Sequence, residues 1–556
     1  MAFTSVKVPA EILAKGPTGY RIKVVDYNAT EQRAYLDRQD YQDEAGALLD
    51  PFGCGPGETP EDPAYQTRLI GDPNFHAQNC YAIAMRTLGA FERALGRRVS
   101  WSSGGHQLHI APHAFAQANA FYSEPDRALL FGYFYGEDGQ PIFTCLSHDI
   151  VAHETTHALL DGLRSRFTEP SGPDQSAFHE GFADIVALLS IFSLESVVAA
   201  AIGEDGALVK GERTIRLVDA AKLEPKAMRK SILLGIARQV GEALTPNRLG
   251  EDARGALRRS VEVTPTEGKR LRRSNDEHDR GEVIVAAMMR CFIELWSERI
   301  VNLGTFEGDR YNLDAVVEEG VKVAGHLLNM AIRALDYCPP TDIDFRQFLA
   351  ALLTADRELV PEDDRNYRGT LRNHFADYGI KTPAKGCDEE GCWLRFSDCA
   401  RLIYARSNFA AMMRNRDEFF RFLWENREAL GVNHRAYTEV VSIDMASRIG
   451  PDGLALHETV CQYVQRVDLF GAEFKSVLGA ELPEGMATTD RLTAHGGGVV
   501  ILDQYGQVKY HISNPVFDGE RQRARAQYLM DAGLLLGPGQ ADRLQFGMIH
   551  LERMGG

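Results

Sequence analysis

Apolar residues recur at two different spacings along the chain, and the change of spacing marks how the chain is organised. Between about residues 20 and 147, short alternating stretches predict strands, and one stretch in the middle, 76–95, has helical spacing. From 150 to about 353, apolar residues recur every three or four positions, which predicts an α-helical lobe. The stretch 281–301 is apolar on most sides, and 313–335 repeats Val, Leu and Ala at spacings of three and four, so both predict core helices.

The last part of the chain returns to a mixed pattern. After a break at 383–391, the spacing predicts a helix at 400–430 and a strand at 437–449. Two alternating stretches, 498–502 and 507–512, surround Asp503-Gln504-Tyr505-Gly506, which is typical of a β-hairpin. We therefore expect a separate C-terminal α+β domain.

These patterns predict an α+β protein, and a chain of 556 residues favours two to four domains. The predicted division is an N-terminal arm at 1–19, a β-rich lobe at 20–147, an active-site helix with a helical lobe at 148–380, a cysteine-containing linker at 381–399, and the C-terminal domain at 400–556. In the linker, Cys387, Cys392 and Cys399 lack C-x2-C spacing, so ordinary thiols and a structural metal site both stay open.

Charge and targeting signals narrow the class of protein. A net charge of −17 argues against nucleic-acid binding, because phosphates would be repelled. The apolar stretch 183–203 carries Asp184 and Glu195, which favours a buried helix over a membrane span. The N-terminus lacks a signal-peptide pattern, and nine scattered cysteines do not suggest a disulfide framework. We expect a cytoplasmic protein, with export by another route left open.

A basic segment at 254–274, containing RGALRRS and GKRLRRS, interrupts the helical lobe. The sequence leaves three interpretations open for it: a solvated loop, a docking site for an acidic partner, or a cover over the cleft.

The segment SHDIVAHETTHALLDGLR at 147–164 carries the candidate chemistry. On a helix, His153 and His157 project from one face, so two imidazoles can reach one metal ion. Zinc suits imidazole ligands, and a catalytic zinc takes three protein ligands and keeps one position for water. Glu154 is placed to accept a proton from that water, whose pKa zinc lowers to about 7. Chance occurrence of the motif and two ordinary core histidines are the alternatives.

A third ligand is predicted from the next helical stretch, HEGFADIVALL. Glu180 can complete the site, and Asp184 lies one turn later on the same face. The Asp184 carboxylate can accept a hydrogen bond from a ligand histidine and fix its tautomer. For Asp184 alone, an N-terminal helix carboxylate favoured by the helix dipole is an equally good interpretation.

At these residues the sequence resembles the thermolysin family of glutamate-ligand zinc metallopeptidases. Asn119-Ala120-Phe121-Tyr122 resembles the family's edge strand, which holds an extended peptide through Asn and Ala. Asp149 precedes the HExxH motif and Asp161 follows it as in the family. The resemblance, over about 20–380, implies a two-lobe fold with a β-rich N-terminal lobe and one catalytic zinc held by His153, His157 and Glu180.

The resemblance also implies further site residues. Arg216, in Thr214-Ile215-Arg216-Leu217, matches the arginine that binds a substrate carbonyl, and His278 matches the histidine that stabilises the tetrahedral intermediate. Ile150 and Ile215 are candidate walls of an apolar S1′ pocket, which would favour cleavage before a large hydrophobic residue. Asp149 is a candidate for a position behind the ligands.

The chain also departs from the family pattern. The loop 164–178 has no tyrosine to help hold the oxyanion, although Phe167 lies there. The aspartate that orients the histidine matched by His278 is missing upstream, and Asp276 or Glu277 are candidates to replace it. Apolar residues stand where calcium carboxylates would be, so we expect no calcium: Leu189, Ile191 and Phe192.

Other zinc hydrolases fit less well. A metzincin needs Gly at 160 and His at 163, where this chain has Leu160 and Leu163, and the exopeptidase string Gly-x-Met-Glu-Asn does not occur. The sequence therefore predicts a zinc endopeptidase acting on peptides or proteins, without nucleic-acid or membrane partners. Two alternatives stay open: an impaired protease-like scaffold that binds a partner through its C-terminal domain, and a protease restricted to one partner chosen by that domain.

Overall fold

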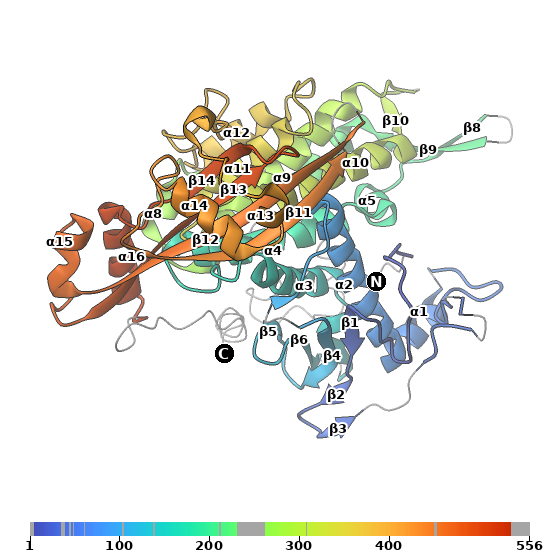
Figure 1. Ribbon diagram of the computed structural model, residues 1–556. Helices are drawn as coiled ribbons and strands as arrows, with labels where there is room; N and C mark the ends of the chain where they lie inside the picture. Colours follow the sequence, from blue (N-terminus) through green and yellow to red (C-terminus); the bar gives the residue numbers. More distant parts are fainter. Residues whose placement is uncertain are drawn as a thin grey trace.

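The computed structural model describes residues 5–534, apart from 35–38, 44, 45, 48, 61, 103, 104, 137, 138, 211, 212, 231–261, 307 and 450–452. Figure 1 shows three layers of structure: the N-terminal lobe, a helical lobe, and a long C-terminal sheet that lies across the helices. Helix α3 lies between the N-terminal sheet and the helical lobe.

The N-terminal lobe is a mixed sheet covered by one long helix. The strand order is β1-β4-β6-β5, and β7 pairs with β6, so β5 is an edge strand. The strands are β1 (Ile22–Val24), β4 (Leu108–Phe115), β5 (Ala120–Ser123), β6 (Ala128–Tyr135) and β7 (Pro141–Phe143), with a small pair β2 (Tyr27–Asn28) and β3 (Arg33–Ala34) and a short helix α1 (Pro63–Ile70). The predicted helix at 76–95 is confirmed as α2 (Pro73–Leu95). Its N-cap Asp72 and Pro73 start it three residues earlier than predicted, and Gly96 ends it in the left-handed conformation.

The helical lobe follows the predicted pattern. The core helices expected at 281–301 and 313–335 are confirmed as α9 (Glu277–Val301) and α10 (Leu313–Ala334). The other helices are α3 (His148–Leu163), α4 (Pro173–Ile191), α5 (Glu195–Ile202), α8 (Lys269–Arg273), α11 (Phe345–Arg357) and α12 (Tyr367–Asp377). A small sheet of order β10-β9-β8 lies at its edge: β8 (Ala207–Lys210), β9 (Arg213–Asp219) and β10 (Arg310–Asn312).

The apolar stretch 183–203 is divided between two helices. Its first part belongs to α4, which ends at Ile191 with Phe192 as its C-cap. Its second part belongs to α5, whose axis is bent by 84° from that of α4. No single helix in the described part of the chain has the length and apolar character to span a membrane, and this bent pair passes such a test only when its two helices are taken together.

The C-terminal part contains a four-stranded antiparallel meander, β11 (Tyr437–Ile449), β12 (Ala455–Phe470), β13 (Arg491–Leu502) and β14 (Val508–Asn514), with short helices α15 (Phe474–Leu478) and α16 (Gly519–Asp531). The predicted strand at 437–449 and the hairpin around 503–506 are confirmed. The single helix predicted at 400–430 was wrong. Asn408 and Asn415 cap two short helices instead, α13 (Phe409–Met412) and α14 (Arg416–Glu425), because their side chains accept hydrogen bonds from the following backbone N–H groups.

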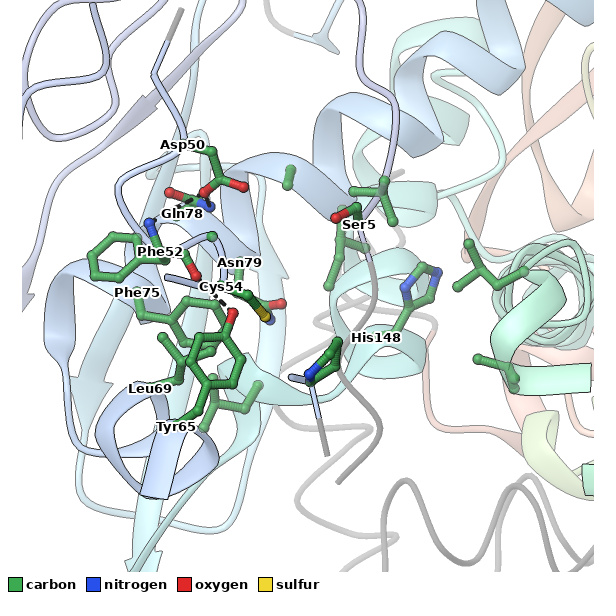
Figure 2. Close-up of a pocket in the computed structure, with 18 residues that line it drawn as sticks. Ser5, Asp50, Phe52, Cys54, Tyr65, Leu69, Phe75, Gln78, Asn79 and His148 are labelled. Atoms are coloured by element: carbon green, nitrogen blue, oxygen red, sulfur yellow. Dashed lines mark hydrogen bonds between the residues drawn. The ribbon is translucent and has the colours of Figure 1, made fainter. Parts of the chain in front are cut away.

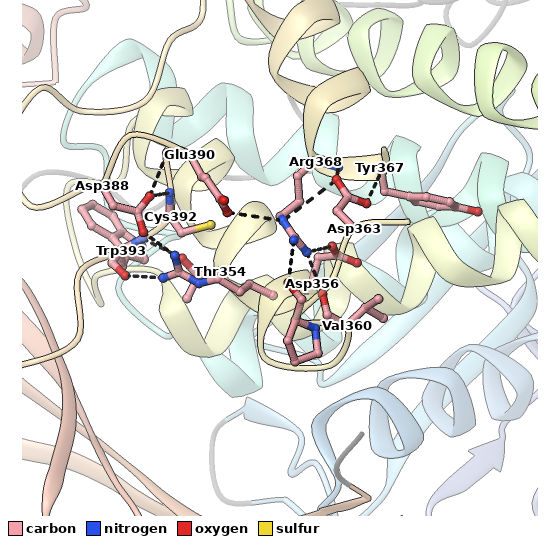
Figure 3. Close-up of polar contacts among 12 residues, drawn as sticks. Thr354, Asp356, Val360, Asp363, Tyr367, Arg368, Asp388, Glu390, Cys392 and Trp393 are labelled. Carbon is pink, nitrogen blue, oxygen red and sulfur yellow. Dashed lines mark hydrogen bonds and ion pairs between the residues drawn. The ribbon is translucent and has the colours of Figure 1, made fainter. Parts of the chain in front are cut away.

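The C-terminal sheet shares a hydrophobic core with the helical lobe. Five of its buried side chains belong to the same cluster as the helices: Val460, Val499, Ile501, Tyr510 and Ile512. The segment predicted as a linker is also held against this lobe, as Figure 3 shows. The Arg357 guanidinium donates to the Trp393 carbonyl at 2.9 Å, and Trp393 N–H donates to Thr354 Oγ1 at 2.8 Å. Other buried side chains of the C-terminal part form clusters of their own, and the predicted division at residue 400 stays a prediction.

Candidate metal centre

Two histidines of α3 meet at a single point. His153 and His157 lie four residues apart, one helical turn, and their Nε2 atoms are 2.8 Å from each other. Both side chains are buried. The helix therefore delivers two imidazole donors to one position, as the spacing predicted.

Helix α4 supplies a carboxylate to the same position. Glu180 Oε2 lies 3.5 Å from His153 Nε2, and Glu180 Oε1 lies 3.4 Å from His157 Nε2. The donor atoms of the three residues all lie within 4.8 Å of one another. Two imidazoles and one carboxylate form a donor set that suits zinc, with a fourth position left for another ligand. The residues present thus fit a zinc ion.

The outer ring nitrogens of both histidines are held in place. Asp184 Oδ1 lies 2.8 Å from His153 Nδ1. When Nδ1 carries the proton, this N–H group donates to the carboxylate, and the lone pair of Nε2 faces the cluster. His157 Nδ1 lies 2.7 Å from the Nδ1 of His179, a contact the sequence did not predict. Burial lowers the pKa of His179 to about 4, so its ring is neutral near pH 7. Asp149 lies in the first turn of α3, where Ser147 Oγ donates to its carboxylate.

Glu154 faces the edge strand of the N-terminal sheet. Tyr122 N–H, in β5, donates to Glu154 Oε2 at 3.0 Å, and Tyr122 Oη donates to Asp161 Oδ2 of the same helix at 2.8 Å. These two bonds from one residue fix α3 against β5. Tyr122 was matched only as part of the edge-strand motif, and its bond to the carboxylate could not be anticipated from spacing.

The motif residues Asn119 and Ala120 lie at the start of the same edge strand. Gly132 N–H of β6 donates to the Asn119 carbonyl at 2.8 Å, so this carbonyl points into the sheet. Ala120 has the opposite orientation, because backbone groups alternate along a strand and Tyr122, two residues later, points to Glu154. Ala120 is therefore the motif residue whose backbone faces α3.

His278 reaches the cluster from the second residue of α9. Its Nε2 lies 3.9 Å from Glu180 Oε2, and its Nδ1 lies 4.0 Å from Asp276 Oδ1. Asp276 caps α9 by accepting from Asp279 N–H at 2.8 Å, so helix capping is its principal hydrogen bond.

A close contact between two helices brings His278 and Glu180 together. Gly181 of α4 faces Gly281 of α9. A Cβ at Gly181 would lie 2.9 Å from the Gly281 carbonyl oxygen and 2.8 Å from Ile284. The missing side chains let α4 and α9 approach closely at the level of the metal centre.

Two predicted residues lie elsewhere. Arg216 and Ile215 are in β9, which projects with β8 from the edge of the helical lobe, away from α3 (Figure 1). The Arg216 side chain is 45% exposed and pairs with Asp314 at the start of α10. The structure does not bring these two residues to the metal cluster, and the substrate contacts predicted for them stay predictions. Ile150 is on α3 and half-buried.

Several other predicted features are placed by the structure. Phe167 is fully buried and its ring packs edge-on against Phe178, at a centroid distance of 5.7 Å. Of the basic segment, 254–261 lies outside the described residues. The remainder contains α8, whose Arg270 pairs with Asp279 at 2.8 Å near the start of α9. Within the described ranges, the linker cysteines Cys387, Cys392 and Cys399 do not form a group of metal donors.

A pocket lies at the other end of α3, apart from this cluster. Figure 2 shows Phe52, Tyr65 and Phe75 on one side, with Ser5 and His148 across from them. Burial lowers the pKa of His148 to about 3, so the ring facing the pocket is uncharged near pH 7. None of His153, Glu154, His157 and Glu180 lines this pocket.

Comparisons with known proteins find a distant likeness among solved structures. No protein-family model matches the chain, and no curated protein matches its sequence. The chain is similar to the solved structure of the precursor of protealysin, a metalloproteinase from Serratia proteamaculans, at 15% identity and a TM-score of 0.33, over 68% of this chain and 91% of that one. A likeness this weak carries no argument about function. The argument about function therefore rests on the site itself.

Proposed function

We propose that the protein is a zinc-dependent endopeptidase in which His153, His157 and Glu180 hold the ion. The observation that carries this proposal is the convergence of two imidazole nitrogens and a carboxylate on one buried point, with Glu154 adjacent on the same helix. Zinc, when bound there, supplies a Lewis acid that polarises a carbonyl oxygen and makes water acidic enough to react near neutral pH. The thermolysin-like resemblance of the sequence agrees with this reading.

In this proposal, Glu154 moves the proton. Its Oε2 accepts a hydrogen bond from Tyr122 N–H at 3.0 Å, which orients the carboxylate at the junction of α3 and β5. Glu154 takes a proton from the attacking water and later gives it to the leaving nitrogen of the peptide bond. General acid–base catalysis of this kind contributes typically about 10²–10⁴-fold in rate.

The substrate would extend β5 as an added strand. Because β5 is the edge of its sheet, an extended peptide can pair with the backbone on the side of Ala120 that faces α3. The Asn119 carbonyl is bonded within the sheet, and its side-chain Oδ1 accepts from Ala120 N–H at 2.8 Å, so the contribution of Asn119 would come from its side-chain amide N–H.

His278 would stabilise the developing oxyanion. Its Nε2, 3.9 Å from Glu180 Oε2, lies at the margin of the cluster and can donate to a negatively charged oxygen formed there. Ile150, half-buried on α3, would form one wall of an apolar S1′ pocket, which favours a large hydrophobic residue after the scissile bond. Arg216 is left out of this mechanism, since it pairs with Asp314 on the β9 side of the lobe.

The test is casein hydrolysis by the wild-type chain, a Glu154→Gln variant and a Glu428→Gln control, with zinc content measured for each. Glu428 is an exposed glutamate of the C-terminal part. We expect Glu154→Gln to retain zinc and lose about 10²–10⁴-fold in turnover, while Glu428→Gln matches the wild type. Full activity of zinc-loaded Glu154→Gln would refute the assigned proton carrier. No hydrolysis by the zinc-loaded wild type would contradict a general endopeptidase and favour the two alternatives, a protease-like scaffold that binds a partner or a protease restricted to one partner.

A further inference from the structure

A second cluster of metal donors lies inside the N-terminal lobe, away from the proposed catalytic centre. It joins three elements: His76 of α2, His113 of β4, and Cys145 of the short 3-10 helix η2 (Thr144–Leu146). The donor atoms of these residues lie within 4.8 Å of one another, and all three side chains are at most 2% exposed. The His76 Nδ1 and His113 Nε2 atoms are 2.8 Å apart.

The outer contacts of the two rings fix which nitrogen carries the proton. His76 Nε2 lies 2.8 Å from the Ile70 carbonyl oxygen, which can only accept, so Nε2 must be the protonated nitrogen. His113 Nδ1 lies 2.8 Å from Asp26 Oδ1, so its proton likewise points outward. In their neutral forms, both rings then direct a lone pair at the other across 2.8 Å. A cation has to lie between them, either a metal ion or a proton held by one ring.

The same arrangement occurs at the proposed catalytic centre. There, two ring nitrogens also lie 2.8 Å apart, in that case the Nε2 atoms of His153 and His157, while Asp184 holds the outer nitrogen of His153. The pattern of a carboxylate behind a ligand histidine is typical of metal sites, and Asp26 provides it for His113.

Two thiols distinguish the second cluster from a simple pair of histidines. Cys80 lies one helical turn after His76 on α2, hence on the same face, and its thiol donates to the Cys145 carbonyl at 3.5 Å. A proton shared by two histidines would leave these thiols without a role.

We propose that His76, His113 and Cys145, completed by Cys80, form a structural zinc site. Two imidazoles and two thiolates are a donor set that zinc takes in closed tetrahedral sites, with no position left for substrate. Cys145 lies two residues before Ser147, the N-cap of α3, so this zinc would tie α2 and β4 to the start of the active-site helix.

The strand carrying His113 is adapted to this role. The pairing of β4 with β6 is interrupted between Ala111 and Phe115, the interval that contains Pro112 and His113. Such an irregularity redirects a side chain out of the regular alternation. The nearby Phe143 ring packs against both histidines, at centroid distances of 4.5 Å from His76 and 5.3 Å from His113.

The test is cobalt substitution of the full-length chain, because thiolate ligands give cobalt a sulfur-to-metal charge-transfer absorption in the near ultraviolet and the His–His–Glu centre has no sulfur. We compare the wild type, His153→Ala/His157→Ala, Cys145→Ser, and Cys338→Ser as a control buried thiol outside both clusters. Zinc content of the same proteins is measured in parallel.

We expect two zinc ions per wild-type chain and one in His153→Ala/His157→Ala, which keeps the charge-transfer band. Cys145→Ser should lose the band and one zinc, and Cys338→Ser should keep both. A folded wild type that takes up cobalt without the band would overturn the proposal, and so would a Cys80–Cys145 disulfide found by thiol counting. If Cys145→Ser does not fold, the wild-type and His153→Ala/His157→Ala spectra still decide. If the wild type binds the thiolate-ligated ion but no ion at His153, His157 and Glu180, the result counts against the proposed peptidase and leaves the second site standing.

Discussion

At the scale of single residues, the metal centre depends on side chains that orient the ligands. Asp184 holds His153 through Nδ1 at 2.8 Å, whereas Asp149 accepts from Ser147 at the start of α3. The two aspartates lie near the same histidine and have different partners, which allows a matched comparison.

We expect Asp184→Asn to weaken zinc binding by about 10–100-fold, because the amide no longer accepts the Nδ1 proton as a carboxylate does. The measurement is the zinc dissociation constant from competition with a chelator. Asp149→Asn serves as the control and should change that constant much less. An equal loss in both variants would mean that general negative charge, rather than the hydrogen bond, is responsible.

We expect His278→Ala to lower kcat by about 10²–10³-fold while zinc content stays the same, since the donor to the oxyanion is lost and the ligands are intact. His326→Ala, on α10 and outside the cluster, is the control. Steady-state kinetics on a fluorogenic peptide provide the measurement, and a change confined to KM would contradict the assigned role.

At the scale of elements, the crossing of α4 and α9 sets the distance between His278 and Glu180. We expect Gly181→Ala to destabilise the protein by about 1–3 kcal/mol, because its Cβ would press on Ile284 and the Gly281 carbonyl. Gly325→Ala on α10 meets no atom within 4 Å and should instead stabilise by up to about 1 kcal/mol through helix propensity. Urea unfolding of both variants checks this, and equal effects would rule out the close helix contact.

The elements show what the sequence could and could not predict. Local spacing was sufficient for α2, α9, α10 and β11, and the four-residue spacing of His153 and His157 placed both on one face. Contacts between segments far apart in the chain could not be predicted from the sequence. His113 and Cys145 lie 37 and 69 positions after His76 in the printed sequence, so only the His76–Cys80 spacing on one helix was a visible signal of the second cluster.

At the scale of the whole molecule, buried ion pairs fasten the C-terminal sheet to the rest. Asp336, in the turn after α10, pairs with Arg97 at 2.7 Å and also with Arg448 of β11. Burial alone would raise the pKa of Asp336, but these two guanidinium groups lower it well below its usual range. The sequence showed two patterns here, and the shared core and charge network became visible only in three dimensions.

Glu358 provides the pH dependence expected of this interface. Burial alone would raise its pKa, but Lys509, Tyr510 and Arg395 lower it to about 2 from an ordinary 4.5. The stabilisation is present above pH 4.5 and is lost as the pH falls toward 2, because the unfolded chain takes up this proton first. We expect the wild type to lose about 3 kcal/mol more than Glu358→Gln over this interval, measured by urea unfolding. Parallel losses in both proteins would contradict it.

The central claim is that hydrolysis depends on zinc held by His153, His157 and Glu180. The most direct measurement is the rate of peptide cleavage by chelator-treated protein as zinc is added back, with folding followed by circular dichroism. We predict that cleavage disappears on chelation and returns in step with zinc in the wild type, and does not return in His153→Ala/His157→Ala. Cleavage at full rate by folded, zinc-free protein, or none by the zinc-loaded wild type, would contradict the account.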